Sequence, residues 1–211
     1  TYCLIDAEGP ENLGLPTLKY PAELGPVPKV LDIPEIPPSH VAAIAFTSGS
    51  TGTSLPHLKT WGSMVRIARN TGNRLIADNT KEFSIVATVP PQHMYGLETS
   101  IMLPLQHKGA LHSDLPFFPM DIREALESVP QNCILVTTPI HLKACIESAV
   151  KFPKVSLIIS ATAPLSRELA ESAEKLFDTR VFEIYGCTEV GSLATRQTSK
   201  SNTWKLLDET S

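Results

Sequence analysis

The stretch that decides the fold lies at residues 41–54 and reads Val-Ala-Ala-Ile-Ala-Phe-Thr-Ser-Gly-Ser-Thr-Gly-Thr-Ser. Its first six residues form a continuous apolar run of strand length. Its last eight are six hydroxyl-bearing residues and two glycines, a composition typical of a polar loop. Trp61, Met64, Ala68 and Leu75 then recur at helical spacing. The stretch therefore predicts a strand, a loop and a helix, in that order.

The same alternation continues toward the C-terminus. We expect further strands at residues 84–89, 109–112, 133–138, 155–160 and 181–185, and helices at 95–105, 121–128, 140–150 and 166–177, the last with Ser166 as its N-cap. Strands separated by helices of about 10–15 residues predict an α/β fold with a mostly parallel sheet and helices on both faces. Ligands of such sheets bind beyond the carboxyl ends of the strands. We therefore expect the functional site in the loops that follow them.

Composition narrows the class of protein. The 211 residues carry 18 Lys and Arg against 22 Asp and Glu, a net charge of −4, which argues against a nucleic-acid or anionic-membrane surface. No apolar run approaches the ~18 residues of a membrane span, and the N-terminus lacks the order of a signal peptide. The four cysteines are widely spaced and form no C-x-x-C pair. These features predict a soluble, cytoplasmic protein with reduced thiols.

Proline is unevenly distributed. The chain has 18 prolines, and eight of them precede residue 39. Because proline lacks a backbone N–H and fixes its φ angle, so dense a series disfavours a long helix. We expect residues 1–40 to be an extended, proline-rich lead-in and residues 41–211 to form the domain.

The loop at residues 47–54 is a candidate phosphate site. Glycines allow the backbone amides to turn inward, and the hydroxyls add donors, so the loop could surround a polyphosphate. It lacks the G-x-x-x-x-G-K-[ST] pattern of a Walker loop, which disfavours a P-loop phosphotransferase. A flexible connector is the alternative interpretation.

Two later loops also contain residues that could bind a ligand. The turn Tyr185-Gly-Cys-Thr-Glu-Val-Gly191 presents an aromatic face that could stack on a nucleobase. Within it, Thr188 could donate to a phosphate oxygen and Glu189 could hold Mg²⁺. Glu189 as an ordinary exposed acid is the alternative. The segment Ser160-Ala-Thr-Ala-Pro164 has small residues that let a ligand approach the backbone.

Together, in this order and spacing, these loops resemble the adenylate-forming superfamily of acyl-CoA synthetases, aryl-acid ligases and peptide-synthetase adenylation domains. The resemblance covers residues 41 to about 195. Its motifs are Phe46-Thr-Ser-Gly-Ser-Thr-Gly52, which matches [YF]-T-S-G-[ST]-T-G; Pro90-Pro-Gln-His-Met-Tyr-Gly96, similar to P-x-x-H-x-x-G; Thr138-Pro139 followed by Leu142, similar to the loop behind the acyl pocket; Ala163-Pro-Leu-Ser166, similar to A-P-L-S; and Tyr185-Gly-Cys-Thr-Glu189, similar to Y-G-x-T-E.

The resemblance implies a role for each motif. Thr188 would touch the α-phosphate, Glu189 would carry Mg²⁺, and His93 would lie near the substrate carboxylate or at the mouth of the acyl pocket. A histidine held by structural hydrogen bonds is the alternative for His93. The residues implied to bind ATP or AMP are Thr47, Ser48, Gly49, Ser50, Thr51 and Gly52 at the phosphates and Ala161, Thr162, Ala163, Tyr185 and Gly186 around the adenine.

The reaction implied is the ATP- and Mg²⁺-dependent activation of a carboxylic acid as an acyl-adenylate. The acyl group would pass to a thiol, either coenzyme A or the phosphopantetheine of a carrier protein. The family also has a ribose-binding aspartate, a hinge and a small C-terminal domain, which residues 192–211 do not supply. We therefore expect the chain to be part of a large N-terminal domain and inactive alone. The alternative is a nucleotide-binding module without chemistry.

Three departures from the family pattern stand out. The family's x-P-K-G is replaced by Thr53-Ser-Leu-Pro-His-Leu-Lys59, which leaves open whether Lys59 reaches a phosphate. Glu183 stands where the family prefers Asn or Gln, and Ala161 and Thr162 stand where two glycines are common. The other histidines are expected to be structural or at the surface: His40, His57, His107, His112 and His141.

Overall fold

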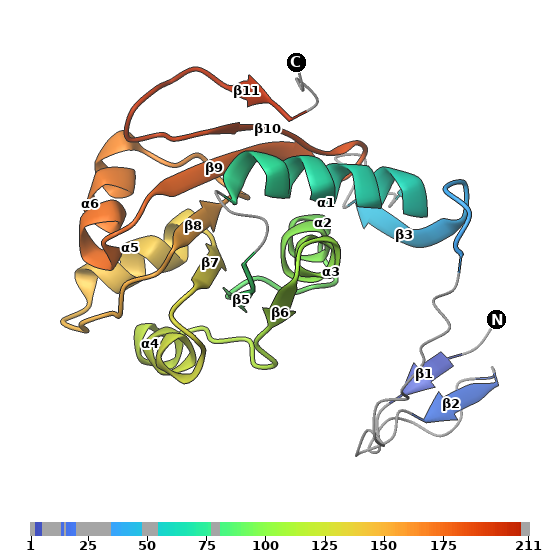
Figure 1. Cartoon of the computed structure of the whole chain (residues 1–211), viewed down its shortest axis with the longest axis horizontal. Helices are drawn as coiled ribbons and strands as arrows, with labels where there is room; N and C mark the ends of the chain where they lie inside the picture. Colours follow the sequence, from blue (N-terminus) through green and yellow to red (C-terminus); the bar gives the residue numbers. More distant parts are fainter. Residues whose placement is uncertain are drawn as a thin grey trace. The chain divides into compact units, whose positions relative to one another are not determined.

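The structure is a computed structural model that describes residues 3–5, 14, 16–19, 35–47, 55–76 and 81–207. The chain divides into two units, Thr1–Glu35 and Ile36–Ser211. In the first unit, β1 (Cys3–Ile5) pairs in parallel with β2 (Thr17–Lys19) (Figure 1). Most residues of the predicted lead-in lie outside the described part, so its extended character stays a prediction.

The second unit is built on a seven-stranded sheet of order β11-β10-β9-β8-β7-β5-β6. The pairs from β6 to β9 are parallel, whereas β10 runs antiparallel to both β9 and β11. The prediction of a mostly parallel sheet is confirmed, and the antiparallel edge is an addition to it. The strands are β5 (Phe83–Ala87), β6 (Gly109–Leu111), β7 (Cys133–Thr137), β8 (Leu157–Ser160), β9 (Val181–Cys187), β10 (Gly191–Arg196) and β11 (Lys205–Leu206).

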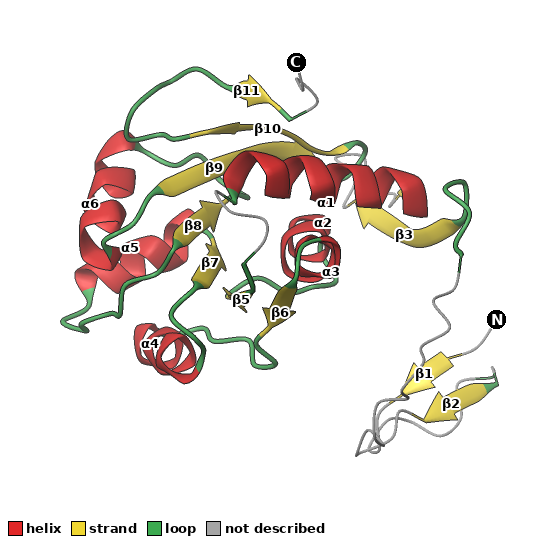
Figure 2. Ribbon diagram, in the orientation of Figure 1, coloured by secondary structure: helices red, strands yellow, loops and turns green. Residues whose placement is uncertain are grey.

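Helices cover both faces of this sheet, as predicted (Figure 2). Successive side chains of a strand point to opposite faces. Leu135 of β7 packs in the cluster formed by α4, α5 and α6, while its neighbours Ile134 and Val136 pack in a second cluster with Leu75 and Leu103. The helices are α1 (Trp61–Leu75), α2 (Met94–Gly96), η1 (Leu97–Met102), α3 (Leu103–Gln106), α4 (Pro119–Ser128), α5 (Pro139–Glu147) and α6 (Arg167–Phe177).

Local signals explain two of these helices. The Ser166 hydroxyl accepts from the Leu169 N–H at 3.2 Å, so the predicted N-cap of α6 is confirmed. The helix expected at residues 95–105 was predicted to break near Pro104, and this break is wrong, because the helical segment continues from residue 94 to residue 106. Residues 97–102 form a π-helix, and Pro104 lies at the start of α3, where a missing N–H is tolerated.

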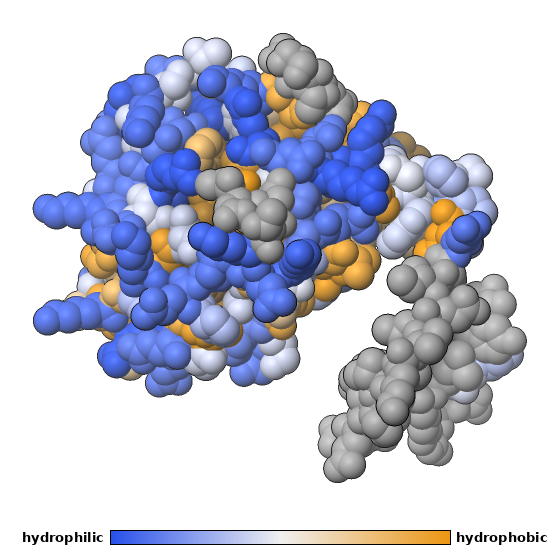
Figure 3. All heavy atoms as spheres, in the orientation of Figure 1, coloured by the Kyte–Doolittle hydropathy of each residue, from blue (hydrophilic) through white to orange (hydrophobic). Residues whose placement is uncertain are grey.

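The first predicted strand is confirmed, but it does not join the mostly parallel sheet as we expected. Residues 41–47 do form a strand, β3 (Val41–Thr47), but it pairs antiparallel with β4 (Leu55–Thr60) in a separate two-stranded sheet. Its apolar run therefore is not buried between two helical layers, and Phe46 is 64% exposed. Apolar surface is visible in this part of the molecule (Figure 3). Among the described residues, no helix has both the length and the apolar character needed to cross a membrane.

Candidate functional site

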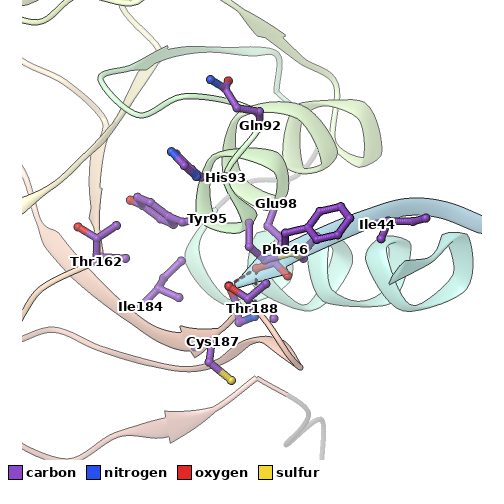
Figure 4. A pocket seen from close by; sticks show the side chains of 16 residues that line it. Ile44, Phe46, Gln92, His93, Tyr95, Glu98, Thr162, Ile184, Cys187 and Thr188 are labelled. Carbon is purple, nitrogen blue, oxygen red and sulfur yellow. Dashed lines mark hydrogen bonds between the residues drawn. The ribbon is translucent and has the colours of Figure 1, made fainter. Parts of the chain in front are cut away.

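A cavity of about 450 Å³ lies beyond the carboxyl ends of the parallel strands (Figure 4). Five segments line it: residues 44–46 of β3, 92–95 with residue 98 of η1, 161–162 after β8, 184 and 186–188 at the end of β9, and 191–192 of β10. This is the edge of the sheet where the sequence predicts a ligand.

The cavity brings together predicted residues that are far apart in the sequence. His93, Thr162 and Thr188 come from three different loops and line the same space, together with Ala161 and Gly186 (Figure 4). Ala163 is exposed in the segment after β8. Because three motifs converge on one cavity, the geometry is that of a composite binding site.

His93 precedes α2 and is exposed. Its side chain makes no hydrogen bond to the described part of the chain, so the structural alternative has no described partner to support it. The neighbouring Tyr95 is the residue that fixes this segment: its hydroxyl lies 3.1 Å from the Thr137 carbonyl and 2.9 Å from the Ile159 carbonyl. Burial raises the pKa of Tyr95 above its ordinary value, so the phenol stays a donor.

Only one end of the predicted phosphate loop is described. Thr47 ends β3, with its Cα opposite that of Leu55 in β4. The remaining predicted residues of this loop lie outside the described residues: Ser48, Gly49, Ser50, Thr51 and Gly52.

Tyr185 does not line the cavity, although its neighbours Ile184 and Gly186 in β9 do. It is 59% exposed, and its ring centroid lies 5.6 Å from that of Trp204. The guanidinium of Arg196 lies over the Trp204 ring at 4.4 Å. Sequence reasoning missed Trp204 because it follows the last recognised motif, in a polar segment.

Glu183, the unusual residue before the turn, is buried and fully engaged. It accepts from the Leu165 N–H at 3.0 Å, from Arg196 Nε at 2.7 Å and from the Thr198 hydroxyl at 2.8 Å. A carboxylate fits here because Arg196 supplies the opposite charge. Glu183 of β9 thus connects the segment before α6 to the end of β10.

Glu189 lies on the exposed turn after β9, with a side chain that is 51% exposed. Hydrogen bonds from its own backbone amide and from Cys187 hold the pKa of this carboxyl below its ordinary value, with smaller contributions from His57 and Lys59. His57 Nε2 lies 3.9 Å from Glu189 Oε1. The expectation that His57 is only structural or at the surface therefore misses its contact with a predicted site residue.

Lys59, the displaced lysine, contacts the turn that carries Glu189. It is 5% exposed, and its Nζ donates to the carbonyl of Glu189 at 2.8 Å. In this structure the ammonium is therefore engaged by the protein's own backbone. The contact joins residues 130 positions apart, and no sequence pattern marks it.

Glu98 is a second charged residue that sequence reasoning missed. It is buried in the wall of the cavity, where its Oε2 accepts from the Ser192 N–H at 3.0 Å and from the Ser192 hydroxyl at 2.5 Å. Burial raises the pKa of Glu98, while Ser192 and Lys59 act in the opposite direction. Gly191 has a φ of +84°, and a Cβ there would collide with the Glu98 carboxylate. The sequence does offer one signal for Glu98, because it is an acidic residue within the largely apolar segment that follows His93.

Comparison with known proteins finds a matching family and curated relatives. Residues 4–209 match the family described as AMP-binding enzyme. The 4-coumarate–CoA ligase of Rhodobacter capsulatus is 28% identical over 155 residues, which are 74% of this chain and 39% of that protein. The 4-coumarate–CoA ligase of Halorhodospira halophila is 27% identical over 169 residues, or 80% and 41% of the two chains. The chain thus spans about two fifths of these relatives.

Solved structures share the fold at lower identity. ATP-bound MatB from Rhodopseudomonas palustris has a TM-score of 0.68 at 20% identity, covering 83% of this chain and 35% of that one. O-succinylbenzoate coenzyme A synthetase from Bacillus subtilis, in complex with ATP and magnesium, has a TM-score of 0.70 at 19% identity, covering 95% and 42%. These likenesses confirm the predicted fold class.

Proposed function

The chain belongs to the AMP-binding enzyme family, and on this premise we propose that the full-length protein activates a carboxylic acid as an acyl-adenylate. The observation that supports this most is the convergence of His93, Thr162 and Thr188 on one cavity beside Glu189. The relatives whose names are CoA ligases support it independently.

The proposed reaction has the substrate carboxylate attack the α-phosphorus of ATP, with pyrophosphate as the leaving group. Negative charge on the phosphoryl oxygens must then be met by oriented donors and a cation. The Thr188 hydroxyl, on the cavity wall, would donate to the α-phosphate. His93, at the same wall, would orient the incoming carboxylate.

Glu189 suits the magnesium ion that this chemistry needs. Mg²⁺ prefers hard oxygen ligands and commonly binds through one or two carboxylates together with substrate phosphates. Glu189 is exposed and its lowered pKa keeps it ionised. No group of three His, Cys, Asp or Glu side chains gathers in the described ranges, which fits a metal held jointly with a nucleotide rather than by protein alone. The ion would neutralise phosphate charge.

The adenine and the phosphates of the nucleotide would be held by different segments of the chain. Tyr185 would offer its exposed ring to the adenine. Ala161, Thr162 and Gly186, which line the cavity, and the exposed Ala163 would surround the same base. The loop at residues 47–52 would hold the β- and γ-phosphates, because residues 44–46 of β3, which precede it in the chain, line the same cavity.

The acyl group would then pass to a thiol. Coenzyme A is our proposed acceptor, because the two curated relatives are CoA ligases; a carrier-protein phosphopantetheine is the second candidate. We further propose that residues 41–211 are part of the large N-terminal domain of a cytoplasmic enzyme. We also propose that residues 1–211 alone would not catalyse the reaction.

The test is exchange of labelled pyrophosphate into ATP by the full-length protein with a panel of aryl and fatty acids. Exchange that depends on both an acid and Mg²⁺ is the expected result. Absence of exchange with every acid, together with absence of ATP binding, would contradict the proposal. Binding of ATP without exchange would instead support a nucleotide-binding module.

A further inference from the structure

The turn that carries Thr188 and Glu189 is tied to two other elements by buried charged residues. On one side, Lys59 of β4 donates to the Glu189 carbonyl at 2.8 Å. On the other, Glu98 of η1 accepts two hydrogen bonds from Ser192, at 3.0 Å and 2.5 Å. Lys59 is 5% exposed and Glu98 is 4% exposed. The proposed chemistry uses neither residue, so their presence needs another explanation.

Packing alone does not explain a lysine at position 59. A buried ammonium loses its hydration, and one hydrogen bond to a neutral carbonyl recovers only part of that loss. A methionine would fill a similar volume without this cost. Glu98 is close enough for the charge of Lys59 to lower the pKa of its carboxyl, so the two opposite charges attract each other. The two charges therefore stabilise each other on either side of the turn.

Lys59 also stands at an informative place in the chain. Residues 48–54 connect β3 to β4, and Thr47 and Leu55 are the last paired residues at that end of the hairpin. Lys59 lies further along β4 and is the first lysine after the phosphate-loop motif. Its bond thus links the hairpin that carries the loop to the turn that carries Glu189.

Resting on the proposed function, we infer that Lys59 is a positioning residue, which holds the Thr188–Glu189 turn at a fixed separation from the phosphate-loop hairpin. Glu98 supports the same turn from the opposite side through Ser192. The phosphates and the metal carboxylate must be correctly spaced for in-line attack, and a misplacement of about 1 Å can lower a rate by about 10²-fold.

Three variants of the full-length protein test the inference. Lys59→Met removes the donor and keeps the side-chain length. Lys59→Arg keeps both charge and donor. Lys143→Met is the matched control, because Lys143 is 65% exposed and pairs with Glu147 on the surface of α5. Pyrophosphate exchange is measured for each at varied acid, ATP and Mg²⁺ concentrations, and the folded fraction is measured by chemical denaturation.

Lys59→Met is expected to lower kcat by about 10²-fold and to raise the half-saturating Mg²⁺ concentration, with the KM for the acid within about threefold. Lys59→Arg should recover at least about a tenth of the wild-type rate, and Lys143→Met should match wild type. A kcat for Lys59→Met that falls only with its folded fraction, or an unchanged Mg²⁺ requirement, would overturn the inference. If Lys59→Met does not fold, Lys59→Gln takes its place under the same criteria.

The wild-type protein separates this inference from the proposed function. Failure of wild type to exchange pyrophosphate with any acid contradicts the proposed function and, with it, the role of Lys59. Normal exchange by both wild type and Lys59→Met overturns the positioning role alone. Glu98→Gln adds a second line of evidence: combined with Lys59→Met, its effect on kcat should be less than additive, because both residues hold one turn.

Discussion

Arg196 and Glu183 form a buried ion pair, with 2.7 Å between Nε and Oε2 and side chains that are 17% and 5% exposed. The same guanidinium lies over the ring of Trp204, which in turn contacts Tyr185. Arg196 therefore connects the buried Glu183 carboxylate to the pair of rings formed by Trp204 and Tyr185. The Tyr185 ring is the one proposed to stack on adenine.

We expect Arg196→Met to lower the free energy of unfolding by about 3 kcal/mol, because it leaves the Glu183 carboxylate buried without its counter-charge. The Arg196→Met/Glu183→Gln double variant should lose less than the sum of the two single changes. Urea denaturation of the full-length protein measures both. Arg123→Met is the control, since its pairing with Glu127 is on the surface of α4. Equal losses at positions 196 and 123 would contradict this account.

Thr162 has a φ of +80°, which a β-branched residue rarely adopts. Thr162→Gly should therefore stabilise the protein by about 1 kcal/mol, the approximate cost of the left-handed region for a residue with a Cβ. Ala163→Gly is the matched control: it is also exposed, but its φ is not positive, so the change should be neutral or slightly destabilising. A thermal unfolding midpoint that falls for Thr162→Gly would show that the backbone is not strained there.

The exposed ring of Tyr185 predicts a specific loss of nucleotide affinity. Stacking of a base on an aromatic side chain contributes about 1–3 kcal/mol, so Tyr185→Ala should weaken AMP binding by roughly 10-fold or more. Tyr185→Phe should bind as wild type does, because the hydroxyl is not needed for stacking. Isothermal titration calorimetry of the full-length variants checks this, and equal affinities for wild type and Tyr185→Ala would place the adenine elsewhere.

The parts of the fold that could be predicted from the sequence are those with a strong local signal. β7 and β8 are buried on both faces, so they appear as continuous apolar runs, and α6 combines helical periodicity with a capping serine. β4 could not be recognised because its Pro56, His57 and Lys59 interrupt any apolar pattern. The antiparallel β10 was missed since a turn motif, read as a loop, leads directly into it.

The candidate site divides in the same way. Residues such as His93, Thr188 and Glu189 lie in short motifs whose order in the chain identifies them. The residues that hold them are identified only by contacts between distant segments, such as that of Glu98 with Ser192, 94 positions away. Sequence patterns indicate periodicity and turns, whereas a single hydrogen bond between distant segments produces no pattern in the sequence.

Thr188 and Glu189 allow the most direct test of the proposed chemistry. Thr188→Ala and Glu189→Gln should each lower the rate of pyrophosphate exchange by roughly 10²-fold or more, by analogy with the loss of a donor to a developing negative charge. For Glu189→Gln, excess Mg²⁺ should restore part of the rate; for Thr188→Ala it should not.

The pH dependence of the half-saturating Mg²⁺ concentration tests the protonation state of Glu189. The pKa of Glu189 lies below its ordinary value of 4.5, so the carboxylate stays ionised as the pH falls through the usual glutamate range. Any stability that its ionised form contributes is present above the ordinary pKa and is lost only when the pH falls through the lowered one. From neutral pH down to about 5, the half-saturating Mg²⁺ concentration should therefore vary with pH in the same way for wild type and Glu189→Gln, because only the terminal phosphate of ATP, with a pKa of about 6, takes up a proton there. A rise within that range that is absent from Glu189→Gln would show that Glu189 takes up a proton there, contrary to the structure.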